Sequence, residues 1–123
     1  MKKFSCVIVD DDPLMLAVIS DMVEGIQELE LVGAYENSVS ATTGITKTKP
    51  ALLLLDLMMP GLDGLDVLDV MDVKPNVIVI SGMANMEEMV LRHPQVVEFL
   101  HKPVTEETLK LAVRNFVKSQ TGR

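Results

Sequence analysis

Short apolar runs alternate with longer segments of helical periodicity along the whole chain. The runs are four to six residues long, rich in Val, Ile and Leu, and bounded by polar or turn-forming residues, as buried strands are. We predict strands at residues 4–9, 29–34, 51–55, 77–80 and 96–100. The intervening patterns predict helices at residues 13–24, 38–47, 64–73, a short one near 86–92, and 105–118.

The order of these elements predicts the fold class. Strict alternation of strands and helices is typical of an α/β fold, in which helices cover both faces of a parallel sheet. Local signals support the boundaries: Asp12 before Pro13 suits a helix start, and Gly25 suits its end. Thr105 is a suitable cap for the last helix, whose apolar residues at 109, 112, 113 and 116 follow helical spacing.

Length and composition indicate one globular domain. The 123 residues are 48% hydrophobic but only 3% aromatic, so the core is expected to consist mainly of aliphatic side chains. We expect one domain over residues 1–123, with 119–123 as a flexible tail. The net charge of −7 disfavours direct binding of nucleic acid by this domain.

The sequence also indicates the compartment. Cys6 is the one cysteine, so no internal disulfide can form, as expected in a reducing cytoplasm, and we interpret it as a small core residue. Three aspartates end the first apolar run after six residues, which favours a strand over a signal peptide. No apolar stretch approaches the roughly 18 residues of a membrane span. We expect a soluble, cytoplasmic protein.

Acidic residues follow two of the predicted strands. Asp10 and Asp11 end the first strand, and Asp56 follows four leucines in the third. If the strand order is 2-1-3-4-5, these two strands flank the point where the order reverses, and the three carboxylates meet at one crevice. Oxygen ligands without Cys or His nearby suit Mg²⁺. The alternative is that residues 10–12 form only a polar turn and a helix cap. We assign the role of helix cap to Asp12 in either case.

Two other strand ends carry polar residues of complementary chemistry. Ser81 ends the fourth strand, and Lys102 follows the fifth. A hydroxyl and an ammonium beside a carboxylate and metal crevice are the groups that bind phosphoryl oxygens. Taken singly, Ser81 is also compatible with a turn residue and Lys102 with a solvated surface charge. Their occurrence at the same edge as the carboxylates favours a phosphoryl site.

Four short segments, in their order and spacing, resemble response regulator receiver domains. These segments are VIVDDDP at 7–13, LDLMMPGLDG at 55–64, ISG at 80–82 and HKP at 101–103, and the one around Asp56 is the most specific. The resemblance covers nearly the whole chain. It implies a flavodoxin-like (βα)5 fold with a five-stranded parallel sheet of order 2-1-3-4-5. It also implies a signalling domain of a two-component system rather than an enzyme acting on other substrates.

The resemblance further implies a role for each site residue. Asp56 is the expected phosphoacceptor; Asp10, Asp11, Asp56 and the backbone carbonyl of Met58 are the expected Mg²⁺ ligands. Ser81 and Lys102 are expected to bind the phosphoryl oxygens, and Ser81 and Phe99 to act as switch residues, although Phe99 is equally compatible with core filling. The implied phosphodonor is a histidine kinase or a phosphotransfer protein. An output domain or a homodimer partner is expected to contact a surface made by the fourth helix, fifth strand and fifth helix. Met83, Met86 and Met89 lie early in this region of the sequence.

Two other functions are compatible with some of these residues. Residues 10–12 resemble the Asp-x-Asp motif of haloacid-dehalogenase-like phosphatases, but the chain has no room for a cap domain and the segment 56–64 then has no role. A phosphorylation-independent interaction domain is the other alternative, although every expected site residue is present. Neither His93 nor His101 matches a motif of phosphorylated histidines, and both are expected at the surface.

Overall fold

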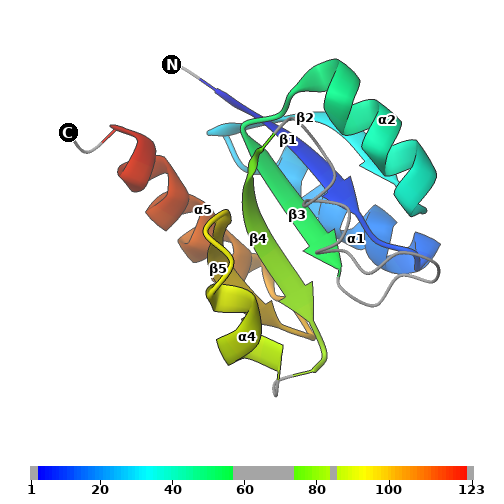
Figure 1. Cartoon of the computed structure of the whole chain (residues 1–123). Coiled ribbons are helices and arrows are strands. Elements are labelled where there is room, and N and C mark those ends of the chain that lie inside the picture. The colour runs from blue at the N-terminus through cyan, green and yellow to red at the C-terminus, as the bar shows by residue number, and fades with distance from the viewer. Residues whose placement is uncertain (1–2, 57–73, 84–85, 122–123) are drawn as a thin grey trace.

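Five parallel strands form one sheet, in the order β2-β1-β3-β4-β5 (Figure 1). The structure is a computed structural model and describes residues 3–56, 74–83 and 86–121. The strands and the reversal of their order confirm the predicted α/β fold. The strands are β1 Phe4–Val9, β2 Leu29–Tyr35, β3 Leu52–Asp56, β4 Asn76–Ser81 and β5 Val96–His101. The helices are α1 Pro13–Glu24, α2 Ser38–Thr48, α4 Glu87–Leu91 and α5 Glu106–Thr121.

The ends of several elements differ from the predicted ends by one to three residues. β4 and β5 each end on a polar residue, and Ser81 pairs with His101, because a parallel ladder is made by backbone groups and needs no apolar side chain. α5 reaches Thr121, so residues 119–121 are helical rather than part of the expected tail. There the Ser119 hydroxyl donates a hydrogen bond of 2.6 Å to the carbonyl of Phe116. The predicted helix at 64–73 lies outside the described residues.

The starts of α1 and α5 are capped by side chains, as predicted. Asp12 accepts a hydrogen bond of 3.0 Å from the amide of Leu14, and Pro13 occupies the first helical position. At α5, the Thr105 hydroxyl accepts from the amide of Thr108 at 3.1 Å, and the Thr108 hydroxyl accepts from the amide of Thr105 at the same distance. These reciprocal bonds fix where the chain leaves β5 and enters α5.

Alternating side chains of the strands form a hydrophobic core on each face of the sheet. One core combines Ile8, Leu54 and Ile80 with residues of α1 and α5, including Phe116, whose ring meets that of Phe4 edge-on at 5.3 Å. The other combines side chains of the strands with residues of α2 and α4. Its buried members are Val7, Val9, Ala41, Ile45, Leu53, Leu55, Val77, Val79, Val90, Val96 and Phe99. Within the described ranges, no helix is long and apolar enough to cross a membrane.

Tyr35 ties the end of β2 to α2. Its ring occupies the space beside Gly33 and Gly44, and a Cβ atom at either position would overlap the ring. Its backbone carbonyl accepts a hydrogen bond of 3.1 Å from the amide of Asp10. The two glycines therefore allow an aromatic ring between strand and helix, directly next to the first residue after β1.

Cys6 is fully buried in β1, in agreement with its predicted role in the core. Burial raises the pKa of its thiol to about 12 from an ordinary value of 9.0. Because thiolate is the reactive form, neutral solution then holds about a thousandfold less of it than for an ordinary thiol. We expect iodoacetamide to label Cys6 only after urea unfolds the protein, as followed by intact mass. Rapid labelling of the native protein would contradict this burial.

Candidate functional site

The sheet brings two acidic strand ends together. β1 and β3 are neighbours, with Val9 paired to Leu55, so Asp10 and Asp56 follow equivalent positions of adjacent strands. Both are buried, at 1% and 3% exposure, although both are carboxylates. Isolated carboxylates are costly to bury, which indicates that this edge of the sheet is built around their charge.

Asp10, Asp11 and Asp56 form a cluster of carboxylates. One oxygen of each lies within 4.8 Å of the others. Asp10 Oδ1 accepts a hydrogen bond of 2.9 Å from the amide of Asp12, whereas the buried Asp10 Oδ2 makes no hydrogen bond within the described residues. An oriented carboxylate oxygen that accepts no hydrogen bond, beside two other carboxylates, fits a hard divalent cation, which prefers oxygen ligands.

The cluster affects the protonation of Asp11. Desolvation, the charge of Asp56 and a side-chain hydrogen bond with Asp56 raise the pKa of Asp11, while a backbone hydrogen bond and the charge of Lys102 oppose the increase. A carboxyl group with a raised pKa in the folded state favours folding below its unfolded pKa. That contribution is lost as pH rises through the folded value. Without a cation, the ionised Asp11 therefore destabilises the fold at neutral pH.

We expect Asp11→Asn to raise the melting temperature of the EDTA-treated protein at neutral pH. The increase should shrink as the pH falls through the raised pKa of Asp11, and it should vanish below the ordinary value of 3.8, where Asp11 is neutral in the folded and unfolded states alike. Thermal unfolding followed by circular dichroism measures both values. Asp12→Asn is the matched control, because it removes the same charge at an exposed cap where Asn serves as well as Asp. A pH-independent gain, or an equal gain in the control, would exclude repulsion within the cluster as its cause.

Lys102 and Ser81 lie at the same edge of the sheet. Lys102 Nζ is 3.5 Å from Asp56 Oδ2 and 3.7 Å from Asp10 Oδ2, and the side chain is 27% exposed. Its amide donates a hydrogen bond of 2.9 Å to the carbonyl of Ser81. Ser81 is fully buried, and its hydroxyl accepts a hydrogen bond of 3.0 Å from the amide of Met83. The Lys102 ammonium thus lies between the carboxylates of Asp10 and Asp56, and the Ser81 hydroxyl lies at the end of the adjoining strand β4.

Phe99 and His101 occupy the same face of β5, two residues apart. Phe99 is 6% exposed and belongs to the core on the α2 and α4 face. The rings of Phe99 and His101 meet edge-on, with centroids 5.0 Å apart. His101 is exposed, as expected, but its Nε2 lies 2.8 Å from Glu87 Oε1 on α4. This contact could not be predicted from the sequence, because Glu87 and His101 lie 14 residues apart in different elements.

The structure thus brings together Asp10, Asp11, Asp56 and Lys102, with Ser81 on the neighbouring strand end. Met58 lies outside the described residues.

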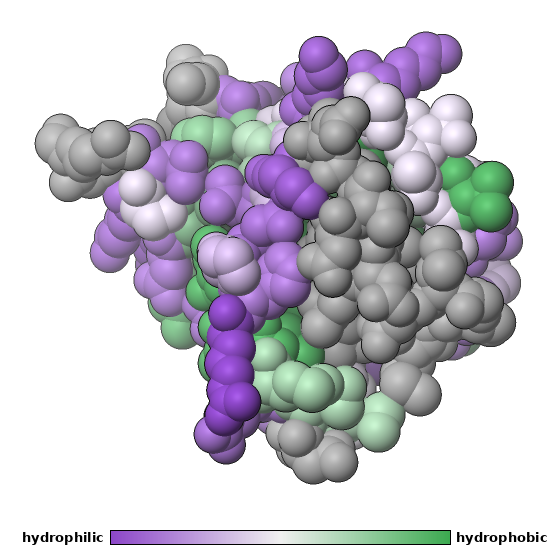
Figure 2. All heavy atoms as spheres, in the orientation of Figure 1, coloured by the Kyte–Doolittle hydropathy of each residue, from purple (hydrophilic) through white to green (hydrophobic). Residues whose placement is uncertain are grey.

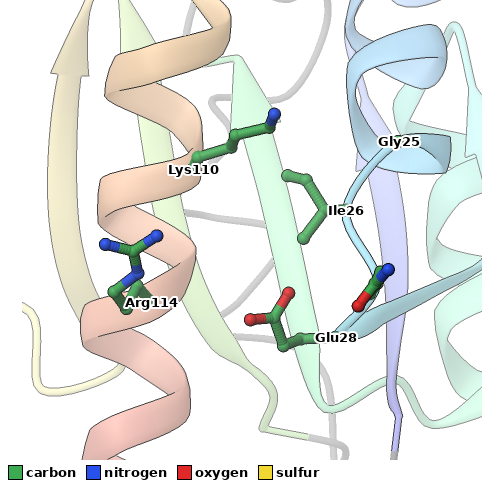
Figure 3. Close-up of a pocket in the computed structure, with 6 residues that line it drawn as sticks. Gly25, Ile26, Glu28, Lys110 and Arg114 are labelled. Atoms are coloured by element: carbon green, nitrogen blue, oxygen red, sulfur yellow. The ribbon is translucent and has the colours of Figure 1, made fainter.

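Figure 3 shows a separate pocket of about 280 Å³ between the turn after α1 and the side of α5. Basic and acidic side chains face each other there, and its lining comprises Gly25, Ile26, Gln27, Glu28, Lys110 and Arg114. Because none of the clustered carboxylates lines it, this pocket is not part of the candidate site.

A family model and solved structures match this architecture. The model, described as the response regulator receiver domain, matches residues 6–114. The response regulatory domain of protein mrkE from Klebsiella pneumoniae has a TM-score of 0.84 at 17% identity, covering 97% of this chain and 99% of that one. The signal receiver domain of the putative response regulator NarL from Mycobacterium tuberculosis has a TM-score of 0.82 at 25% identity, covering 96% and 98%.

Curated relatives are longer proteins. A protein-glutamate methylesterase/protein-glutamine glutaminase from Myxococcus xanthus is 32% identical over 109 residues, which are 85% of this chain and 31% of that protein. A protein of the same description from Geobacter sulfurreducens is 32% identical over 117 residues, or 90% and 32%. The chain therefore spans about a third of the length of these relatives, and the similarity concerns that part of them.

Proposed function

The chain belongs to the response regulator receiver domain family, and from this we propose that Asp56 accepts a phosphoryl group in a reversible, Mg²⁺-dependent signalling reaction. The donor is the phosphohistidine of a histidine kinase or of a phosphotransfer protein, and the reaction takes place in the cytoplasm. The main supporting observation is the convergence of three carboxylates and the Lys102 ammonium at one edge of the sheet, with Lys102 Nζ 3.5 Å from Asp56 Oδ2.

In this reaction a carboxylate oxygen of Asp56 attacks phosphorus. The new oxygen–phosphorus bond forms as the phosphorus–nitrogen bond of the donor breaks, and the donor imidazole keeps the bonding electron pair and takes a proton from solvent. The product is an acyl phosphate on Asp56. Lys102 offsets negative charge on the transferring group, and the position of its ammonium between Asp10 and Asp56 supports this role.

The other site residues bind Mg²⁺ and orient the phosphoryl group in this proposal. Asp10, Asp11, Asp56 and the Met58 carbonyl are the proposed ligands of Mg²⁺, which when bound offsets the charge of the carboxylates and of the incoming phosphoryl group. Ser81 donates its hydroxyl hydrogen to a phosphoryl oxygen, and movement toward that oxygen would weaken the hydrogen bond that the hydroxyl now accepts from the amide of Met83. Ser81 and the neighbouring Phe99 are the proposed switch residues.

The proposed partner surface consists of α4, β5 and α5. Light green apolar atoms lie among hydrophilic ones over α4 in Figure 2, near the bottom of the view. The exposed apolar side chains of this surface and of the turn before α4 are Met83, Met89, Leu91, Val97 and Leu111, with exposures from 37% to 57%. Methionine side chains suit adaptable interfaces. We propose that an output domain or a second copy of the chain binds here after phosphorylation.

We propose no catalytic activity beyond the gain and loss of the phosphoryl group on Asp56. The methylesterase and glutaminase activities in the names of the curated relatives belong to proteins about three times as long as the shared region. A haloacid-dehalogenase-like phosphatase is not supported, since the family match includes the segment around Asp56, for which that function has no use.

The test is incubation with acetyl phosphate, with and without Mg²⁺, followed by intact mass and peptide mapping. We expect one phosphoryl adduct, located on Asp56 and absent in EDTA. An adduct on Asp10, or one that forms equally well in EDTA, would overturn the proposal. Rapid release of phosphate from an added phosphate monoester would support the phosphatase instead.

A further inference from the structure

We propose that His101 and Glu87 form a latch that holds the first turn of α4 against the end of β5, and that this latch restrains the switch at Ser81. The proposal rests on the proposed function, because it assigns a restraint to the same switch. The latch bond joins His101 Nε2 and Glu87 Oε1 at 2.8 Å. A carboxylate can only accept, so the ring N–H donates.

The latch belongs to a closed circuit of contacts that includes Ser81. The Ser81 hydroxyl accepts from the amide of Met83 at 3.0 Å, and the Met83 carbonyl accepts from the amide of Met86 at 3.1 Å. Met86 directly precedes Glu87, the first residue of α4. From Glu87 the latch returns to His101, which is paired with Ser81 across β4 and β5. The position of the Ser81 hydroxyl is therefore connected to α4 through two routes.

The start of α4 packs against the core through Met86 but has few other polar restraints in the part of the chain that the structure describes. The helix has five residues, and its cap residue Met86 makes no side-chain capping bond. Val90 is buried against the sheet at the far end of the helix. Glu88, next to Glu87, pairs with Arg92 within α4 at 3.2 Å and so does not tie the helix to the sheet. Among the described residues, the Glu87 contact is thus a direct polar side-chain link between α4 and β5.

The circuit has a mechanical consequence. If the Ser81 hydroxyl turns to a phosphoryl oxygen, the Met83 amide loses its acceptor and the turn before α4 is released on one side. The latch then still holds Glu87 beside His101 and opposes displacement of α4. His101 also contacts the ring of Phe99, so a displaced latch would change the surroundings of that ring. His101 and Glu87 are accordingly positioning residues, without contact to the phosphoryl group.

Amide hydrogen exchange of the free protein tests the latch without phosphorylation. We expect Glu87→Ala and His101→Ala each to speed exchange of α4 amides by about two- to tenfold, the range for one hydrogen bond. Glu87→Gln, which keeps an acceptor oxygen, should restore much of the protection. The control Glu88→Ala should change exchange by at most about twofold and leave the amide shifts of Phe99 and His101 unchanged. Equal effects of Glu87→Ala and Glu88→Ala would overturn the latch.

Beryllofluoride with Mg²⁺ then separates this proposal from the proposed function. We expect it to shift the ring signals of His101 in the wild type, and to produce larger shifts of α4 amides in Glu87→Ala than in the wild type or Glu88→Ala. If beryllofluoride binds Asp56 but the His101 signals and the α4 response are the same in all variants, the latch is refuted and the phosphoacceptor role stands. If no beryllofluoride binds, the phosphoacceptor role fails, and the restraint on Ser81 fails with it.

Discussion

Asp56→Asn should abolish phosphoryl uptake from acetyl phosphate. The amide keeps nearly the size and shape of the carboxylate but lacks the anionic oxygen that attacks phosphorus. Because Asp56 is 3% exposed and borders Lys102 and two acidic residues, its replacement also removes one negative charge from a crowded site. We therefore expect a folded protein without an adduct, in contrast to a loss of function by unfolding.

Intact mass after incubation with acetyl phosphate and Mg²⁺ measures the adduct, and circular dichroism monitors the fold. Asp12→Asn provides the control, since it makes the same chemical change two residues after Asp10, at an exposed helix cap. It should accept phosphate as the wild type does. An adduct of wild-type amount in Asp56→Asn would mean that another residue is the acceptor.

Phe116→Ala should lower the free energy of unfolding by about 3–5 kcal/mol. The Phe116 ring is 2% exposed and packs edge-on against Phe4, in the core between the sheet and α1 and α5. Removal of the ring leaves a cavity in the core. The chain has three Phe and one Tyr in all, so few other large rings are available to fill it. The loss is a large part of the stability of a domain of this size.

Urea denaturation at equilibrium measures this change. Leu111→Ala is the comparison on the same helix, because Leu111 is 57% exposed and its truncation should change the free energy by about 0.5 kcal/mol or less. If both variants lose the same amount, the Phe116 ring does not contribute the packing that the structure indicates.

The fold was predictable because its strands carry their signal locally. Central strands of a parallel sheet are buried on both faces, so Leu52 to Leu55 form an uninterrupted apolar run that differs plainly from the helical patterns. Strand ends were less predictable, since backbone pairing extends β4 to Ser81 and β5 to His101 regardless of side-chain polarity. Likewise, the continuation of α5 to Thr121 follows from helical hydrogen bonding, which a polar sequence does not reveal.

The candidate site was predictable to the extent that strand ends determine it. Asp10, Asp11 and Asp56 follow apolar runs, and the topology of a doubly wound sheet then brings such ends together. The orientation of a long side chain was not predictable, because the contacts of Lys102 with Asp10 and Asp56 depend on rotamers that no local pattern encodes. The pairing of Glu87 with His101 joins residues 14 apart in different elements, and nothing in either segment indicates the other.

The position of Tyr35 gives the protein a built-in optical reporter. The chain has one tyrosine and no tryptophan, so its near-ultraviolet fluorescence comes mainly from the ring held between Gly33 and Gly44. The carbonyl of the same residue accepts from the amide of Asp10. Occupancy of the acidic cluster, or a displacement of α2 relative to β2, should therefore change the emission of an unlabelled sample, and a titration with Mg²⁺ can be followed in a fluorimeter without any engineered probe.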